Sequence, residues 1–359
     1  MKTLVFGAGP LGSLMAARLH EAGQDLTLLA RGQRLEDLKE HGVVLESGID
    51  GPRTVTRVKT TESLDPDDPY DLIMVVMRMN QAVKILPTLA ANKHASTVLF
   101  MMNNFAGPEQ LVEALGKERV MSGFPYPGGE RIGHVIRIVP ADEDHRWTIP
   151  IGEVDGRITP RTRHVAAFLS TMEGYEVEIR RDMDAWLKCH VAALMPAFVP
   201  ALYACETDVE RLARTRDALV LAVRGIREGF RALRKAGVGL TPRALRLVFW
   251  VPEPVMVALL RQACKLEMMK ISGEGHARAA RDEMEYLTHQ FKQFVTGRGI
   301  QTPVIDRMMK WYDPKTPPLP DGSSEIPMRK RGLGIVVGAA AAVGAVVVGL
   351  LRRRNRNSG

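Results

Sequence analysis

The chain has few of the residues that build disulfide frameworks and metal centres. It has three cysteines, and none of them lies in a CxxC spacing. This scarcity argues against a disulfide scaffold and against a structural zinc site, and it indicates a reducing compartment. The nine histidines form no HExxH or other paired spacing, so we predict no metal site.

The folded part of the chain also lacks an excess of either charge. The net charge is +8, but seven of the 49 basic residues and no acidic residue follow residue 328. Residues 1–328 therefore hold 42 bases against 41 acids. Without a basic surplus, we predict no nucleic-acid partner. A chain of 359 residues with 45% hydrophobic content is long enough for at least two domains.

The C-terminal residues 332–351 lack any polar side chain. These twenty apolar or glycine residues would span the roughly 30 Å hydrocarbon core of a bilayer as one helix. We predict a single transmembrane helix there, followed by a basic tail at 352–359 and preceded by a proline-rich linker at 313–331. A disordered low-complexity tail and a helix buried against the protein are the alternatives. The expectation is a membrane-anchored protein whose body lies in the cytoplasm.

The N-terminal residues have the pattern of a dinucleotide-binding turn. A short apolar strand at 3–6 leads into Gly7, Gly9 and Gly12 in GxGxxG spacing, and a helical pattern follows. The first glycine permits the tight turn, the second lets a pyrophosphate approach the backbone, and the third lets the helix pack on the strand. A second apolar strand at 26–30 follows at the expected distance, which favours cofactor binding over an unrelated glycine turn.

The residues after that second strand distinguish the two nicotinamide cofactors. NAD enzymes usually place an acid there for the ribose 2′-hydroxyl, whereas this chain has ARGQR, with Arg31 and Arg34. Arginines suit a 2′-phosphate, so we predict NADP (NADPH), with two solvated loop arginines as the alternative.

The rest of the sequence indicates an α/β Rossmann domain followed by an all-α domain. Nearly continuous apolar runs at 71–78 and 97–103 are typical of buried parallel strands. Segment 134–155 alternates in polarity and predicts a hairpin, and the chain is mostly helical from about residue 161. We place the NADP-binding domain at 1–175 and the helical substrate domain at 176–312.

Several segments, in order, make the chain resemble the ketopantoate reductase (2-dehydropantoate 2-reductase) family over roughly residues 1–312. The carrying segments are FGAGPLG, LLARGQRLEDLKEHGV, VVMRMNQA, MNNFAGPEQL, AWLKCHVAALMP, DEMEYL and GIQTPVIDRM. The resemblance implies a Rossmann domain, a helical domain, and an active site between them. A homodimer stays open as a further assembly.

The resemblance also implies roles for individual residues. Gly7, Gly9 and Gly12 would hold the pyrophosphate, Arg31 the 2′-phosphate, and Arg78 would lie at the cofactor site. Asn103 would lie near both nicotinamide and substrate, Lys188 would be the catalytic lysine and Glu283 a substrate-side carboxylate. Ser272 is a looser match on the substrate side, because its distance to Glu283 is one residue short.

The chain departs from the family pattern at informative positions. Family members usually have lysine in place of Arg78, a QNG-like turn in place of MNN, and asparagines in place of Ala192 and Pro196. A site that hydrogen-bonds its ligand discriminates strongly, so losing two such contacts argues against ketopantoate itself as the substrate.

Lys188 is the central candidate because it lies on an apolar stripe of a helical segment. Residues three, four and seven positions after it are apolar. An ammonium there could bring a proton and positive charge to a carbonyl oxygen during reduction. The alternative is an ion pair with Asp184, one turn earlier.

Each remaining candidate also has a simpler interpretation. Glu283 could belong to an acidic helix face, Arg78 could pair with a structural carboxylate, and His190 is more typical of a packed histidine than of a second acid.

Three functional hypotheses follow. The first is a membrane-tethered NADPH-dependent reductase of a small 2-oxo acid or related ketone. The second is a reductase of a more apolar, lipid-like carbonyl compound. The third is a non-catalytic NADP-binding sensor or assembly protein at a membrane.

Overall fold

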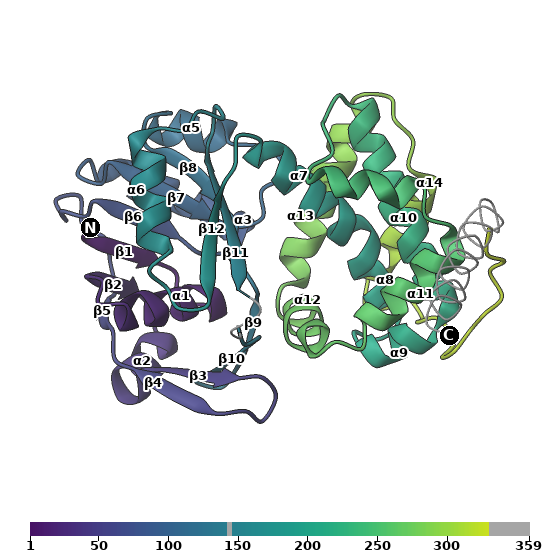
Figure 1. Ribbon diagram of the computed structural model, residues 1–359, viewed down its shortest axis with the longest axis horizontal. Helices are drawn as coiled ribbons and strands as arrows, with labels where there is room; N and C mark the ends of the chain where they lie inside the picture. The colour runs from purple at the N-terminus through teal and green to yellow at the C-terminus, as the bar shows by residue number, and fades with distance from the viewer. Residues whose placement is uncertain (142–145, 330–359) are drawn as a thin grey trace, which may run out of the picture.

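The computed structural model describes residues 1–141 and 146–329, and they form two domains side by side (Figure 1). The N-terminal domain is a Rossmann-like α/β domain and the C-terminal domain is helical, as the sequence predicts. The predicted transmembrane helix at 332–351 and the basic tail at 352–359 lie outside the described residues.

The main sheet of the first domain has eight strands, in the order β12-β11-β8-β7-β6-β1-β2-β5. Six neighbouring strands are parallel, and the last two, β11 and β12, run antiparallel to them. The bounds are β1 (Thr3–Phe6), β2 (Leu26–Leu29), β5 (Lys59–Thr61), β6 (Leu72–Val75), β7 (Thr97–Met101), β8 (Val120–Gly123), β11 (Trp147–Glu153) and β12 (Tyr175–Ile179). The central strands are fully buried, which explains their uninterrupted apolar sequences.

A second, four-stranded sheet lies beside the main one, in the order β4-β3-β10-β9. Its strands are β3 (Val43–Ser47), β4 (Arg53–Thr56), β9 (Gly129–Ile132) and β10 (Val135–Ile138). The predicted hairpin at 134–155 is wrong, because β10 pairs with β9 and β3, whereas β11 joins the main sheet. The two strands of that segment, β10 and β11, lie in different sheets and are mostly buried.

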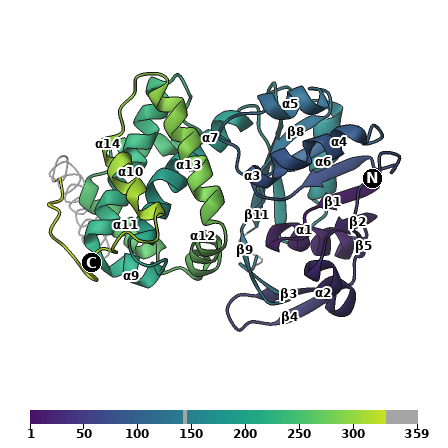
Figure 2. The same ribbon diagram turned by 180° about the vertical axis from the view of Figure 1, so that it is seen from behind.

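Helices cover both faces of the main sheet. The helices of this domain are α1 (Pro10–Glu21), α2 (Gln33–His41), α3 (Met79–Ala82), η1 (Val83–Ile85), α4 (Leu86–Ala91), α5 (Glu109–Leu115) and α6 (Pro160–Leu169). One core contains α1, α2 and α6 with the small sheet, and the other contains α3, α4 and α5 (Figure 2). Strand β12 follows α6, so the sheet extends past the expected domain boundary at residue 175.

The second domain packs its helices around α10 and the run from α7 to α8. Its elements are α7 (Met183–Ala193), η2 (Leu194–Phe198), α8 (Val199–Tyr203), α9 (Val209–Arg214), α10 (Arg216–Lys235), η3 (Arg243–Phe249), α11 (Glu253–Ala263), η4 (Met269–Glu274), α12 (Gly275–Ala279), α13 (Arg281–Thr296), α14 (Pro303–Met308) and η5 (Met309–Tyr312). Among the described residues, one run, Met183–Tyr203, is long and apolar enough to cross a membrane, but 78% of it is buried inside this domain. It is the central core helix of this domain.

The proline-rich segment 313–329 has no helix or strand, but it is not a free linker. Its backbone is bonded to the helical domain: the N–H groups of Glu325 and Ile326 donate to Asp217, and that of Arg329 donates to Glu253. The side chain of Arg214 pairs with Asp321 at 2.7 Å. We call residues 313–329 the strap. As the prediction of a linker implies, the strap has no helix or strand. The strap is, however, bound to the helical domain and does not hang free from it.

Candidate active site

The glycine turn joins β1 to α1 in the geometry that the motif predicts. Gly7 has φ +120°, and a Cβ on Gly12 would lie 1.9 Å from the Gly7 carbonyl oxygen, so both positions require glycine. A Cβ on Gly9 would meet no atom within 4 Å. The turn therefore packs tightly on its inner side and is open at Gly9, where the N-terminus of the twelve-residue helix α1 begins.

Arg34 stabilises this turn through hydrogen bonds within the fold, so it is not positioned to bind a phosphate. Its guanidinium donates to the Ala8 carbonyl, to the His134 carbonyl and to the Ser13 hydroxyl, at 3.1 to 3.2 Å. Burial, followed by the nearby Arg131 charge, lowers the pKa of Arg34 to about 10. The interpretation of Arg34 as a phosphate-facing loop residue is therefore wrong, because its donors are already used inside the fold.

Arg31 lies just beyond β2 and is exposed. Its Nε donates to the Glu62 carbonyl at 3.1 Å, and the guanidinium lies 5.9 Å from the centroid of the Phe6 ring. No acidic side chain pairs with Arg31 within the described residues. Its terminal nitrogens are thus available to an anion at the carboxyl edge of the sheet.

Two asparagines near the same edge each have a buried side-chain oxygen without a hydrogen-bond partner within the described residues. Asn103 follows β7 and is 5% exposed, and its Oδ1 has no hydrogen-bond partner within the described residues. The Oδ1 of Asn80, at the start of α3, is in the same state, while its amide nitrogen donates to Asp282 at 2.9 Å. An unpaired buried acceptor costs free energy, so each of these oxygens is a candidate for a ligand donor. Asn104, by contrast, closes a turn with Gly107.

The start of α3 is joined directly to α13 of the helical domain. Glu283 is 2% exposed and accepts a hydrogen bond from the Met79 N–H at 3.1 Å, and its other oxygen lies 3.4 Å from Nε2 of His276. Arg78 pairs with Asp282 at 2.8 Å and donates to the Ala279 carbonyl. Glu283 is therefore not on a solvated acidic face. Arg78 does pair with a structural carboxylate, the alternative left open above.

Lys188 lies on α7 with its side chain buried, and its ammonium pairs with Asp184. This is the helix ion pair expected as the alternative. The Asp184 side chain is 46% exposed, so the buried ammonium is paired with a carboxylate at the surface of the domain. Within the described residues, Lys188 makes no hydrogen bond to Glu283 or Asn103.

Next to Lys188, the other face of α7 carries an aromatic cluster. His190 stacks on Trp186, with ring centroids 5.4 Å apart and planes 8° apart, and it also contacts Phe124 and Tyr126. Burial, with a smaller contribution from His276, lowers the pKa of His190 to about 4. His190 is thus a packed, neutral histidine, as the simpler interpretation has it.

Ser272 lies in η4 of the helical domain and donates to the Pro127 carbonyl at 2.9 Å. Its side chain lies so close to Gly128 that a Cβ there would be 2.6 Å from the Ser272 Oγ. Ser272 therefore faces the loop that follows β8, on the Rossmann side of the domain junction.

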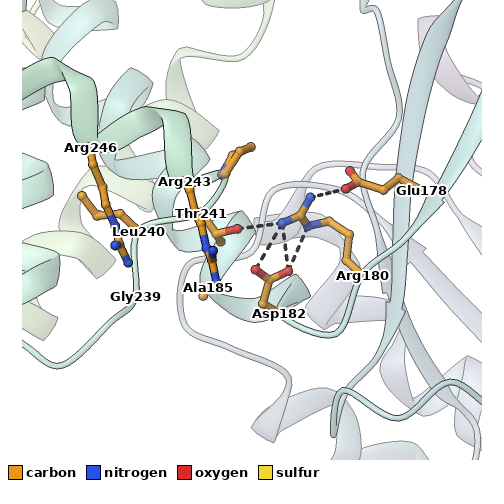
Figure 3. Close-up of a pocket in the computed structure, with 10 residues that line it drawn as sticks. Glu178, Arg180, Asp182, Ala185, Gly239, Leu240, Thr241, Arg243 and Arg246 are labelled. Atoms are coloured by element: carbon orange, nitrogen blue, oxygen red, sulfur yellow. Dashed lines mark hydrogen bonds and ion pairs between the residues drawn. The ribbon is translucent and has the colours of Figure 1, made fainter.

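A separate pocket of about 470 Å³ lies at the chain connection between the domains, where β12 leads into α7 (Figure 3). Arg180 crosses it, bonded to Glu178, Asp182 and Thr241. None of the nine predicted site residues lines this pocket. We take the candidate active site to be the junction of the glycine turn, the Asn103 loop and α13, because the unpaired acceptors lie there.

Sequence reasoning missed the partners that shape this junction. Asp282 bonds both Arg78 and Asn80, and His276 faces Glu283. Asn80 has a signal in the sequence, since it stands two residues after Arg78 in MRMNQA. In the sequence, Asp282 stands out only as the acidic residue before Glu283. Its contact to Arg78 spans 204 residues, which no local pattern reveals.

Three features of the site suit a dinucleotide. The turn is open at Gly9, Arg31 has free donors, and Asn103 has an unpaired buried oxygen. These groups would hold a pyrophosphate, a ribose phosphate and a carboxamide or hydroxyl donor, respectively. A metal is a poor match, because no cluster of His, Cys, Asp or Glu in residues 1–141 and 146–329 could hold one.

The chain is similar to known proteins over most of its described length. The model of the family described as ketopantoate reductase PanE/ApbA matches residues 3–142. A 2-dehydropantoate 2-reductase of Archaeoglobus fulgidus is 30% identical over 197 residues, covering 54% of this chain and 61% of that relative. The match thus spans less than two thirds of that relative.

Solved structures extend the similarity of fold to both domains. A 2-dehydropantoate 2-reductase from Geobacter metallireducens superposes with a TM-score of 0.71 at 18% identity, covering 88% of this chain and all of that one. D-mandelate dehydrogenase, solved with NADH and anilino(oxo)acetate, gives 0.68 at 14% identity and covers 87% and 97%. The model of the ketopantoate reductase PanE/ApbA family thus matches the first domain of this chain, and the solved structures, which are under 25% identical, are similar to the chain in fold.

Proposed function

We propose, with that family as the premise, that the chain is an oxidoreductase that uses NADPH to reduce the carbonyl group of a small 2-oxo acid or related ketone. The observation that carries this proposal is the buried, unpaired Oδ1 of Asn103 at the same edge of the sheet as an open glycine turn. A buried acceptor without a partner is expensive, and a ligand bound at the turn would satisfy it. A structural neighbour solved with NADH supports a nicotinamide dinucleotide.

A bound nicotinamide dinucleotide supplies the hydride for such a reaction. The chain's own residues then have four tasks. Gly9 and the start of α1 bind phosphate through backbone N–H groups, and Asn103 accepts a hydrogen bond that orients the bound ligand. Lys188 carries a proton and positive charge to the substrate's carbonyl oxygen, and Glu283 holds α3 against α13 through the Met79 N–H.

For Lys188 to act, its ammonium must turn from Asp184 to the substrate. The partner is half exposed, so water can replace the ammonium at Asp184 when a substrate binds. Because the ammonium itself is buried, the substrate's carbonyl oxygen must take the place of Asp184 as its hydrogen-bond partner. The ion pair in the described structure is therefore compatible with a resting position of the lysine.

The direct test is a turnover screen on the purified chain. NADPH oxidation is measured at 340 nm with ketopantoate, with straight, branched and aromatic 2-oxo acids, and with hydrophobic ketones. Turnover of at least one 2-oxo acid is the expected result. Tight NADPH binding without oxidation of any carbonyl compound would favour the non-catalytic binding protein.

A second candidate substrate class is a more apolar carbonyl compound. The positions four and eight residues after Lys188 are Ala192 and Pro196, both buried, where the family resemblance implies asparagines. Preferential turnover of hydrophobic ketones in the same screen supports this class over small 2-oxo acids.

A ketopantoate reductase from Staphylococcus aureus is described as dimeric. We propose that this chain also forms a homodimer, which light scattering would test.

Arg31→Ala tests the choice between NADPH and NADH. We expect the Kd for NADPH to rise about tenfold or more, because a charge-assisted hydrogen bond to the 2′-phosphate is lost, at about 1.5–3 kcal/mol. The Kd for NADH, which lacks that phosphate, stays within about twofold. Fluorescence titration of both cofactors measures the two constants, and Lys59→Ala, an exposed residue of β5, is the control. Equal weakening for both cofactors contradicts a 2′-phosphate contact.

Membrane tethering through residues 332–351 is part of the proposal. It is supported by twenty consecutive residues without a polar side chain, followed by four arginines. We expect the full chain to resist alkaline extraction from membranes and a chain ending at Arg329 to be released. The cut at Arg329 keeps the strap, whose last bond is from the Arg329 N–H to Glu253. Retention of the shortened chain in the membrane contradicts the tether.

A further inference from the structure

The helical domain exposes an unusual number of large apolar side chains in one stretch. Four of the eight exposed large hydrophobic residues among the described ones fall within residues 247–266. Trp250 is 81% exposed, Leu247 60% and Leu259 58%. Single exposed apolar residues are ordinary, but a nearly fully exposed tryptophan and two exposed leucines within thirteen residues of sequence are typical of a contact surface.

The longer segment that contains this stretch is basic in a body that is otherwise slightly acidic. Residues 229–266 contain seven basic residues and one acid. The acid, Glu253, is buried and bonded to Arg224. Arg243 and Arg246 of η3 are exposed at the pocket of the domain connection and make no hydrogen bond or ion pair within the described residues (Figure 3). Arg231 and Arg234 flank Phe249, the neighbour of Trp250.

The strap ends beside this stretch. Arg224 of α10 bonds both Glu253 and the Pro327 carbonyl, and the Arg329 N–H donates to Glu253. One turn further along α10, Arg227 donates to the carbonyls of Val248 and Val251, on either side of Trp250. The chain therefore leaves the described body at Glu253, three residues after Trp250, and its next two residues are Lys330 and Arg331.

We infer that residues 243–259 form a membrane-contacting surface that lies on an anionic bilayer, with Trp250 at the level of the lipid headgroups. This rests on the tether of the proposed function, since the strap fixes residue 329 next to the surface. Tryptophan is enriched at the membrane interface, and basic residues near an anionic leaflet each add to binding. We call residues 243–259 the docking face.

The chemistry of the docking face favours lipid over other partners. A nucleic acid would use the arginines but gain little from exposed Leu247 and Leu259. A fold-back of residues 332–351 onto the face would use the leucines but leave the basic residues unpaired. An anionic bilayer matches both the apolar and the basic parts.

The full chain, reconstituted into vesicles with anionic lipid, tests the inference through its tryptophans. Lipids brominated near the headgroup quench a tryptophan at the interface. Trp186 and Trp311 are buried, at 8% and 3% exposure, so Trp250 is the main candidate for quenching. We expect the lipid-dependent quenching to be lost in Trp250→Phe and retained in the matched control Trp147→Phe. In vesicles without anionic lipid, the quenching decreases.

The outcomes separate this inference from the tether. Alkaline extraction of the same samples reports whether residues 332–351 insert. Quenching of Trp250 by added anionic vesicles without insertion supports the docking face and refutes the tether. Insertion with equal quenching in wild type and Trp250→Phe overturns the docking face. Emission of Trp250 that is already shifted to the blue without lipid, and unchanged by it, indicates fold-back of the tail and also overturns it. Binding of RNA to the chain, without quenching of Trp250 by lipid, also overturns the docking face.

Discussion

Replacing Lys188 by methionine is expected to lower the rate of carbonyl reduction by a factor of about 10² to 10⁴, the usual contribution of a positioned general acid. Methionine keeps the length and apolar stem of the lysine, and the side chain is buried on α7, so packing changes little. The partner Asp184 is half exposed and can be hydrated, so the variant should fold. Stopped-flow reduction at saturating NADPH, with circular dichroism of the same samples, measures both quantities.

The matched control for Lys188 is Asp184→Asn. It breaks the ion pair of α7 but keeps the ammonium. If Lys188 is the proton donor, Asp184→Asn changes the rate by less than about tenfold. If the pair only stabilises the helix, the two variants lose similar stability and have similar rates. Parallel behaviour of the two variants would therefore remove Lys188 from the mechanism.

The parts of the fold that the sequence predicts well are those set by short-range geometry. The glycine spacing predicts a strand, a turn and a helix within about twenty residues, and the structure has the strand at Thr3–Phe6 and the helix at Pro10–Glu21. The central strands are identifiable because both faces are buried, which makes them continuously apolar. The helical second half follows from its periodic pattern.

The errors arise where distant residues decide the outcome. Strand β10 alternates in polarity like a hairpin strand, but its partners are β9 and the remote β3. Arg34 appears free in the sequence because its three acceptors include a carbonyl 100 residues away. The strap has the composition of a loose linker, yet its backbone N–H groups find buried carboxylates on α10 and α11. The proline-rich composition predicts that the segment is not helical, but it does not predict hydrogen bonds from the backbone to distant carboxylates.

The site shows the same division. The motif predicts the positions of Gly7, Gly9 and Gly12. It does not predict which of these three positions has space for a side chain. Gly7 and Gly12 are constrained by neighbouring backbone, whereas Gly9 borders open space. The sequence therefore predicts a cofactor turn, but only the structure separates glycines required for folding from the glycine available to a ligand.

That separation gives the second large effect, in a pair of alanine variants. Gly12→Ala places a methyl group 1.9 Å from the Gly7 carbonyl oxygen, so the backbone must shift. We expect the free energy of unfolding to fall by about 3 kcal/mol. Gly9 has φ −69° and open space around its Cβ position, so Gly9→Ala should cost less than about 1 kcal/mol. Urea unfolding measures both variants.

The cofactor distinguishes the two variants further. If a pyrophosphate approaches the backbone at Gly9, the added methyl group of Gly9→Ala occupies its space and raises the Kd for NADPH at least about tenfold, which corresponds to about 1.4 kcal/mol. Loss of affinity in a stable Gly9→Ala variant can then be assigned to the ligand and not to misfolding. Unchanged affinity in Gly9→Ala would mean that the dinucleotide, if bound, does not lie against this turn, and the assignment of the whole glycine motif would have to be abandoned.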